Sequence, residues 1–194
     1  MTQQPIYTIG HGGRDLDDFI ALLGRHHIAY LIDVRSQPYS RYQPAFNKDP
    51  LQSRLKDAGI RYLFMGDSLG GRPDDPAAYR EGKVDYDQLQ ELDAYQAGLE
   101  RLEAAQRQGH RVVLLCSERK PENCHRSKLI GRSLTERDVD VRHIDEQDTL
   151  LSQEEIYLRI IGGQPSLFGD DFHRLTSRQR YGSAEDEADQ DDDA

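Results

Sequence analysis

Short apolar runs alternate with amphipathic segments along most of the chain. Five runs have the length and the aliphatic and aromatic content of buried strands, and they cover residues 6–9, 29–34, 60–64, 111–116 and 139–144. Helical spacing of apolar residues predicts helices after residue 13 and over residues 50–58, 87–108, 122–135 and 153–161. This alternation predicts an α/β fold, a three-layer sandwich in which helices cover both faces of a mostly parallel five-stranded sheet.

The predicted domain covers residues 1–162, and a polar region follows the Gly162–Gly163 break. Residues 163–194 are expected to form a largely disordered tail. The last twelve residues contain seven acids and no Lys or Arg, so they account for most of the formal net charge of −10. Such a segment has too little apolar surface to bury on folding. The nearly neutral remainder argues against a broad basic surface for binding nucleic acid. It does not exclude a local basic cleft.

Composition also bears on location. Two cysteines are too few for a disulfide-built secreted domain. The first residues do not resemble a signal peptide, and no apolar run approaches the ~20 residues that span a bilayer. We therefore expect a cytoplasmic protein that contacts no membrane and whose cysteines are thiols or ligands.

Polar clusters follow four of the predicted strands. They contain His11–Gly12, Asp33–Arg35, Gly70–Arg72 and Cys116–Glu118. In open parallel sheets, ligands bind at the carboxyl ends of the strands. One such residue would be an ordinary loop residue, but four clusters at the same edge predict a shared cleft.

The same motifs resemble a known family. In order and in strand context, Thr8–Gly12, Asp33–Arg35, Pro38–Arg41, Leu69–Gly71, Leu115–Glu118, Pro121 and Cys124–Arg126 are similar to the domain-of-unknown-function 488 family. The resemblance covers about residues 5–160. It implies a compact α/β domain that gathers these motifs in one cleft, and it brings no established reaction.

Arginines dominate the predicted cleft. The candidates for binding an anion are Arg35, Arg41, Arg72, Arg119, Arg126 and Ser117. Arginine binds phosphate in a bidentate manner, and a helix beginning near Pro121 would add N–H groups. The alternative is that these arginines pair with neighbouring acids. Gly12, Tyr39, Gly70 and Gly71 are candidates for the loops around a substrate, where Tyr39 could stack on a base.

The candidate catalytic residues are His11, Asp33, Cys116, Glu118, Cys124 and His125. A helix start and nearby cations would favour a thiolate, and His11, Asp33 or Glu118 could transfer protons. The alternative for Cys116 is a small buried residue at a strand end. Neither cysteine has the arginine spacing of a tyrosine-phosphatase loop, and seven residues between them exclude a thioredoxin pair.

No cofactor is required by the sequence, and no residue is assigned to a metal. A metal is the less favoured alternative, for which Cys116, Cys124, His125 and His11, with Glu118 or Asp33, could supply ligands. The cysteine spacing is not that of a zinc finger. Adjacent side chains on a helix diverge by about 100°, which argues against joint ligation by Cys124 and His125.

One motif lies beyond the predicted domain. Residues 164–168, with Gln164, Leu167 and Phe168, resemble the peptide by which bacterial DNA polymerases and repair proteins bind the sliding clamp. An exposed Leu-Phe pair can fill an apolar pocket on a partner. The alternative is that both side chains pack on the domain.

Together these patterns predict an enzyme that acts on a nucleotide or nucleic acid by hydrolysis or transfer, with a role in DNA repair. Two alternatives remain. One is a non-catalytic nucleotide- or nucleic-acid-binding module tethered to the sliding clamp, and the other is a thiol-based or metal-based sensor.

Overall fold

The computed structural model describes residues 4–163, 175–177 and 180–181. Its main sheet has the strand order β3-β2-β6-β1-β7-β8. The strands are β1 (Ile6–Gly10), β2 (Tyr30–Asp33), β3 (Arg61–Phe64), β6 (Val112–Cys116), β7 (Val141–Ile144) and β8 (Leu150–Ser152). All neighbours pair in parallel except β7 and β8, which are antiparallel. The predicted α/β class is confirmed, but the predicted count of five strands is wrong. The sixth, β8, has only three residues, too few to give a periodic signal.

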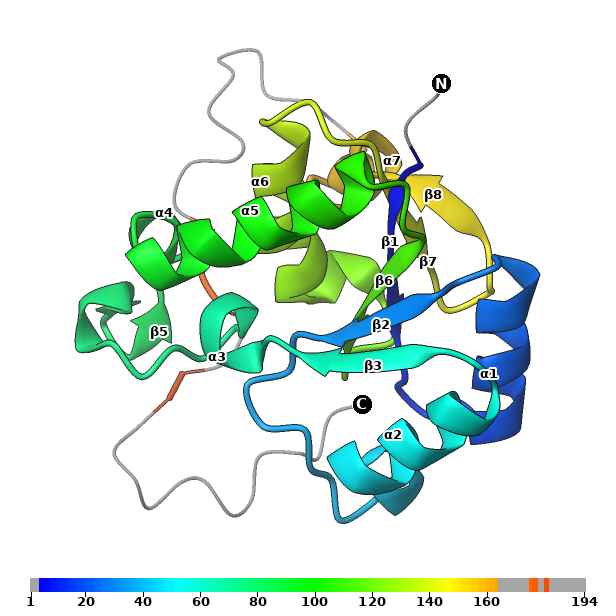
Figure 1. The fold of residues 1–194 in the computed structure, drawn as a ribbon. Helices are drawn as coiled ribbons and strands as arrows, with labels where there is room; N and C mark the ends of the chain where they lie inside the picture. The colour runs from blue at the N-terminus through cyan, green and yellow to red at the C-terminus, as the bar shows by residue number, and fades with distance from the viewer. Residues whose placement is uncertain (1–3, 164–174, 178–179, 182–194) are drawn as a thin grey trace.

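Helices cover both faces of this sheet (Figure 1). On one side lie α1 (Leu16–Arg25) and α2 (Lys48–Asp57), and on the other lie α4 (Tyr86–Gln90), α5 (Asp93–Arg107) and α6 (Arg132–Thr135). The remaining elements are α3 (Gly66–Leu69), α7 (Gln153–Ile160), the 3₁₀ helices η1 (Pro44–Phe46), η2 (Pro76–Ala78) and η3 (Pro121–Asn123), the π-helix η4 (Arg126–Gly131), and the hairpin of β4 (Tyr79–Arg80) and β5 (Lys83–Val84).

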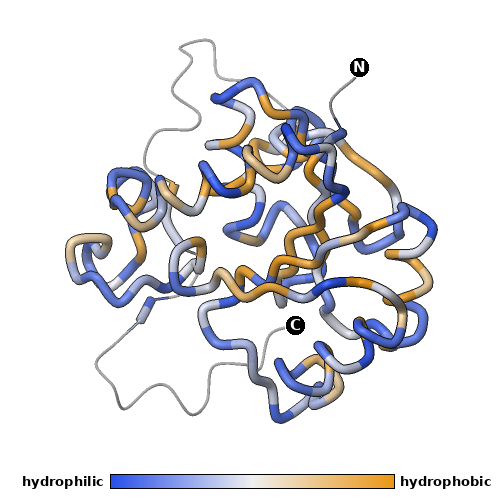
Figure 2. The backbone as a smooth tube through the Cα atoms, in the orientation of Figure 1, coloured by the Kyte–Doolittle hydropathy of each residue, from blue (hydrophilic) through white to orange (hydrophobic). Residues whose placement is uncertain are grey.

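The central strand β6 is buried along its whole length and contributes to two cores. Val113 and Leu115 pack in the cluster that contains Phe19 of α1, whereas Leu114 packs in the cluster that contains Tyr95 of α5. Successive side chains of a strand point to opposite faces, which explains this division. Figure 2 shows the apolar strands enclosed by more polar helices.

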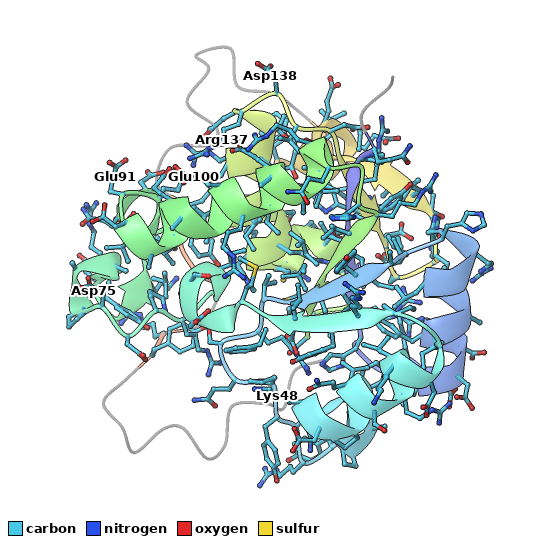
Figure 3. The ribbon with its side chains drawn as sticks, viewed as in Figure 1. Lys48, Asp75, Glu91, Glu100, Arg137 and Asp138 are labelled. Carbon is cyan, nitrogen blue, oxygen red and sulfur yellow. The ribbon has the colours of Figure 1, made fainter. Side chains whose placement is uncertain are left out.

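The outer side of the α4–α5 layer is charged. Glu91 and Glu100, labelled in Figure 3, are both exposed there. Arg137 lies beyond α6 and pairs with Glu103 of α5 at 2.6 Å. This polar exterior fits a helix layer that presents only one apolar stripe to the sheet.

Two predicted helices are divided in the structure. The helix predicted over residues 87–108 is interrupted at Leu92, whose extended backbone (φ −71°, ψ 132°) caps the start of α5. The helix predicted over residues 122–135 consists of η3, η4 and α6, because Cys124 is also extended (φ −117°, ψ 150°). Hydrophobic spacing shows which face is buried, but a single extended residue leaves that spacing nearly unchanged.

Part of the region assigned to the tail contacts the domain. Ser177 N–H donates to Val84 O at 2.9 Å, and Tyr181 N–H donates to Gly82 O at 2.7 Å. The ring of Tyr181 lies 4.3 Å from the guanidinium of Arg72. The described residues after 174 therefore pack beside β5 and the loop that follows α3. None of the helices in the described ranges combines the length and hydrophobicity needed to cross a bilayer.

A buried polar chain links β1, β7 and α7. Thr8 Oγ1 lies 2.8 Å from His143 Nδ1, and His143 Nε2 lies 2.7 Å from Gln153 Oε1. The amide of Gln153 donates in turn to Ser127 O at 3.2 Å. Burial, reinforced by the charge of Arg126, lowers the pKa of His143 from 6.5 to about 3. His143 is therefore neutral in the folded protein at neutral pH.

This histidine should make the folded state sensitive to acid. Between pH 6.5 and about 3 the unfolded chain protonates His143 and the folded chain does not. The free energy of unfolding should therefore fall as the pH falls, by up to about 1.4 kcal/mol per pH unit from this group. Urea unfolding of wild type and His143→Gln between pH 7 and 4 measures the effect, with exposed His27→Asn as control. A wild-type slope that is unchanged in His143→Gln would contradict the prediction.

Candidate functional site

Backbone hydrogen bonds place the loops after β1 and β2 on either side of the end of β6. His11 N–H donates to Cys116 O at 3.0 Å, and Val34 N–H donates to Leu115 O at 3.1 Å. Gly12 N–H continues the first series by donating to Ser117 O at 2.9 Å. Three of the four predicted polar clusters are thus held together by main-chain contacts around Cys116.

Two glycines are required because neighbouring chain lies where a side chain would be. A Cβ at Gly10 would lie 1.7 Å from Glu118 O, a distance that no substitution could tolerate without moving the backbone. A Cβ at Gly71 would lie 2.9 Å from the ring of His125. The loop after α3 therefore reaches His125 directly, which adds the fourth predicted cluster to the site.

Cys116, Cys124 and His125 converge at the centre of this arrangement. Their ligating atoms all lie within 4.8 Å of one another. The distances from His125 Nδ1 are 3.6 Å to Cys116 Sγ and 3.7 Å to Cys124 Sγ. Both cysteines are buried free thiols, exposed by 5% and 2%. Residues nine positions apart in the sequence therefore form a single chemical centre, which we call the Cys-Cys-His centre.

The two thiols differ in acidity. A hydrogen bond from Cys124 lowers the pKa of Cys116 well below its usual range, against the effect of burial, and the charge of His125 adds to the lowering. Burial raises the pKa of Cys124, which keeps the proton that it shares with Cys116. Cys116 is therefore the more acidic thiol of the pair.

The ring of His125 is oriented by the neighbouring strand. Its Nε2 lies 3.2 Å from Val34 O. A carbonyl oxygen can only accept, so Nε2 carries a hydrogen, and Nδ1 is the atom that faces both sulfurs. Burial opposes the charged ring, but the negative charge of Cys116 and the hydrogen bonds with Cys116 and Val34 O together outweigh it and raise the pKa of His125.

Arg126 is a buried cation beside this centre, with 0% exposure. Its Nη2 donates to Arg119 O at 2.9 Å. Its Nε and Nη1 have no hydrogen-bond partner among the described residues. Burial without full hydrogen bonding is costly for a guanidinium, so these two donors are suited to water or an anionic ligand.

His11 is the second histidine of the site. Its ring stacks on Phe46 at 4.8 Å, and its Nδ1 lies 3.1 Å from Gln43 Oε1. The amide oxygen accepts, which leaves Nε2 as the lone-pair nitrogen, and this buried atom has no hydrogen-bond partner in the described part of the chain. Burial and the charge of Arg35 lower the pKa of His11 to about 4. Neutral His11 is therefore a proton acceptor.

Asp33 and Arg35 bind each other rather than an open site. Arg35 Nη2 lies 2.6 Å from Asp33 Oδ2, and Arg35 Nε lies 2.9 Å from Asp33 Oδ1. Tyr62 donates to the same carboxylate at 2.7 Å, and Arg35 also donates to Phe46 O at 2.9 Å. The pair thus fastens the loop after β2 to η1, which carries the ring that supports His11.

The other predicted residues lie around the centre or outside it. Arg119 donates to Glu146 O at 3.1 Å, beyond the end of β7, and Ser117 is exposed. Tyr39 is 68% exposed, and Arg41 lies over the ring of Tyr42 at 4.7 Å. The polypeptide of Gly12 packs against Arg119, and Gly70 packs against Gly66 and Ser36. Gln164, Leu167 and Phe168 lie outside the described residues.

Tyr86 was not predicted as a site residue. Burial raises its pKa well above the usual value, and the charges of Cys124, Tyr181, Cys116 and Glu118 raise it further. Its phenol is therefore within electrostatic range of the Cys-Cys-His centre, of Glu118 and of the ring that Arg72 contacts. The sequence shows Tyr86 only as an aromatic residue at the start of a helix, so nothing distinguishes it from the core.

Comparison of the sequence with profiles of protein families gives a match that covers most of these motifs. The sequence profile described as "Domain of unknown function DUF488" matches residues 15–132, more than half of the chain. The chain belongs to this family. The match includes Asp33, Arg72 and the Cys-Cys-His centre, and it begins after His11. Comparison with curated proteins finds no match.

This DUF488 domain can use the Cys-Cys-His centre in two ways. A thiolate beside an imidazole can attack an electrophilic atom. Two sulfurs and an imidazole nitrogen can also bind a soft divalent cation. Either use places the chemistry at the end of β6, where the backbone of the neutral base His11 is bonded to Cys116 O.

Removing Asp33 should leave Arg35 as an unpaired buried charge. We expect Asp33→Ala to reduce the free energy of unfolding by about 3–5 kcal/mol, as measured by urea denaturation. Asp140→Ala is the matched control, because Asp140 also pairs with an arginine two residues later, at 3.0 Å, but at the surface. The control should cost at most about 1 kcal/mol. Equal losses in both variants would show that burial of the first pair does not matter.

Proposed function

We propose that this DUF488 domain is an enzyme that acts on a nucleotide or nucleic acid by hydrolysis or group transfer in DNA repair. The observation that carries the proposal is the convergence of Cys116, Cys124 and His125 on one buried point, with distances of 3.6 and 3.7 Å to His125 Nδ1. Packing alone does not require two thiols to face the same ring nitrogen. The central strand presents this group at the edge where such folds bind ligands.

Proton transfer would fall to His11. Its Nδ1–H is directed to Gln43, so its free Nε2 can accept a proton from an attacking water or acceptor hydroxyl. The water oxygen forms a bond to the electrophilic carbon or phosphorus, the bond to the leaving group breaks, and the accepted proton passes to the leaving group. Asp33 and Arg35 would act as positioning residues, because they hold the strand and loop that flank the centre.

A phosphate-containing substrate fits the charge of the site. Arg126 supplies a buried positive charge whose Nε and Nη1 have no hydrogen-bond partner among the described residues, and Arg72 follows the glycine that contacts His125. Arginine at these positions would bind phosphate oxygens, and Tyr181 beside Arg72 offers an aromatic face. The proposal includes a cytoplasmic location, where both thiols would stay reduced.

The full chain should be incubated with free nucleotides and with single- and double-stranded DNA that carry modified bases, and products followed by mass spectrometry. His11→Asn should lower kcat by about 10²–10⁴-fold with little change in KM. Arg72→Gln should instead raise KM, whereas Arg101→Gln, an exposed arginine on α5, should change neither constant. Binding without turnover on every substrate would contradict an enzyme and support the non-catalytic binding module.

The peptide Gln164–Phe168 carries a separate proposal, that the chain docks on the DNA sliding clamp. Its support is the sequence: a glutamine, two loosely specified residues and a Leu-Phe pair. Changing both Leu167 and Phe168 to Ala should abolish binding to purified clamp in surface plasmon resonance, because the pair would supply the apolar anchor. Ser166→Ala changes a loosely specified position and should bind normally. Undiminished binding by the double variant would reject this partner.

A further inference from the structure

The Cys-Cys-His centre has one lone pair for two thiols. His125 Nε2 must donate to Val34 O, so a neutral ring offers only Nδ1 as an acceptor. Both sulfurs lie close to that atom, at 3.6 and 3.7 Å. One S–H can donate to Nδ1, but the second cannot do so at the same time. Two sulfurs and one ring nitrogen that face one another form a donor set that suits a soft divalent cation.

From this geometry we infer that Cys116, Cys124 and His125 bind one Zn²⁺ ion. Zinc–sulfur and zinc–nitrogen bonds of about 2.3 and 2.0–2.1 Å, at a tetrahedral angle, place the two ligand atoms about 3.6 Å apart. The observed distances from Nδ1 to the sulfurs already match this spacing. The spacing between the histidine nitrogen and each sulfur therefore already suits a bound zinc ion.

The local backbone removes the objection that adjacent residues cannot share an ion. That objection assumes that Cys124 and His125 are both helical. Cys124 is extended (φ −117°, ψ 150°), and the chain becomes helical only at His125 (φ −61°, ψ −22°). The change in conformation between the two residues brings Sγ and Nδ1 within 3.7 Å.

Surrounding groups already hold the ligands as they are held in zinc proteins. The hydrogen bond of His125 Nε2 to Val34 O fixes the ring and the tautomer, as in most metal-binding histidines. Arg126 N–H lies 3.5 Å from Cys124 Sγ and can stabilise a thiolate there. Gly71 packs against the histidine ring and limits its movement.

The site leaves one coordination position open. Within the ranges that the structure describes, no fourth His, Cys, Asp or Glu joins the group of ligand atoms. Three protein ligands and a water are typical of catalytic rather than structural zinc. This use of the ion rests on the proposed function: zinc would acidify the water, and His11 would receive its proton. The ion site itself does not depend on any activity.

The full 194-residue chain should be purified without chelators and with any affinity tag removed. It should then contain about one zinc ion per molecule, as measured by inductively coupled plasma mass spectrometry. After removal of the metal, Co²⁺ should restore thiolate-to-cobalt absorption in the near ultraviolet and tetrahedral bands in the visible. Cys116→Ser and His125→Ala should each weaken zinc affinity by more than the about 10–100-fold cost of losing an outer-shell contact, measured against a chromophoric chelator.

His110→Ala is the control, because His110 precedes β6 at the opposite end of the strand. Circular dichroism of each variant separates loss of metal from loss of fold. Wild-type protein that is folded, has two thiols reactive towards a disulfide reagent and fails to bind added Zn²⁺ or Co²⁺ would overturn the inference. Metal-free turnover would leave the enzyme proposal standing without zinc, whereas zinc binding without turnover would refute the enzyme proposal alone.

Discussion

The site depends on the parallel pairing of β6 with both β1 and β2. The strand enters the sheet late in the sequence and lies between two strands that precede it by many residues. Its hydrogen-bond series continue beyond the strand end, from His11 N–H to Cys116 O on one side and from Val34 N–H to Leu115 O on the other. A shift of β6 by one residue would turn its side chains to the other face and separate Cys116 from His125. The buried cores on both faces prevent that shift, so the hydrophobic effect also fixes the chemical centre.

Two separate groups of buried polar residues hold the elements around the Cys-Cys-His centre, and we call them its two supports. On the β2 side, the Asp33–Arg35 pair joins the strand to η1. On the β7 side, Thr8, His143 and Gln153 connect the sheet to η4 through Ser127. Buried polar chains are stabilising only when they are complete, and they then define a single arrangement. The first support flanks Val34, whose carbonyl accepts from His125, and the second ends at Ser127, two residues after His125.

Much of the framework could be predicted from the sequence, because five strands are apolar runs and the carboxyl ends of parallel strands share one edge. The strand β8 was missed because three residues carry no period. The partnership of Asp33 and Arg35 did have a signal, since residues i and i+2 share a side when the chain continues in an extended conformation past a strand end. The role of Val34 had no signal in the sequence. Its backbone carbonyl accepts the hydrogen bond from His125, and the side chain does not indicate this. Tyr86 was missed for a related reason, because its contacts depend on segments distant in the sequence.

The π-helix η4 makes the length of the segment after His125 significant. A π turn accommodates one residue more than an α turn, so η4 is equivalent to a one-residue insertion in the helical segment that begins at His125 and continues through α6. Deleting that residue would restore regular α geometry but rotate everything before it by about 100° relative to everything after it. Leu134 would then remain in the core while Cys124 and His125 turned away from Cys116, or Cys124 and His125 would stay in place while Leu134 left the core. The start of this segment faces Cys116 and its end packs in the core, and the wide π turn sets the rotation between the two.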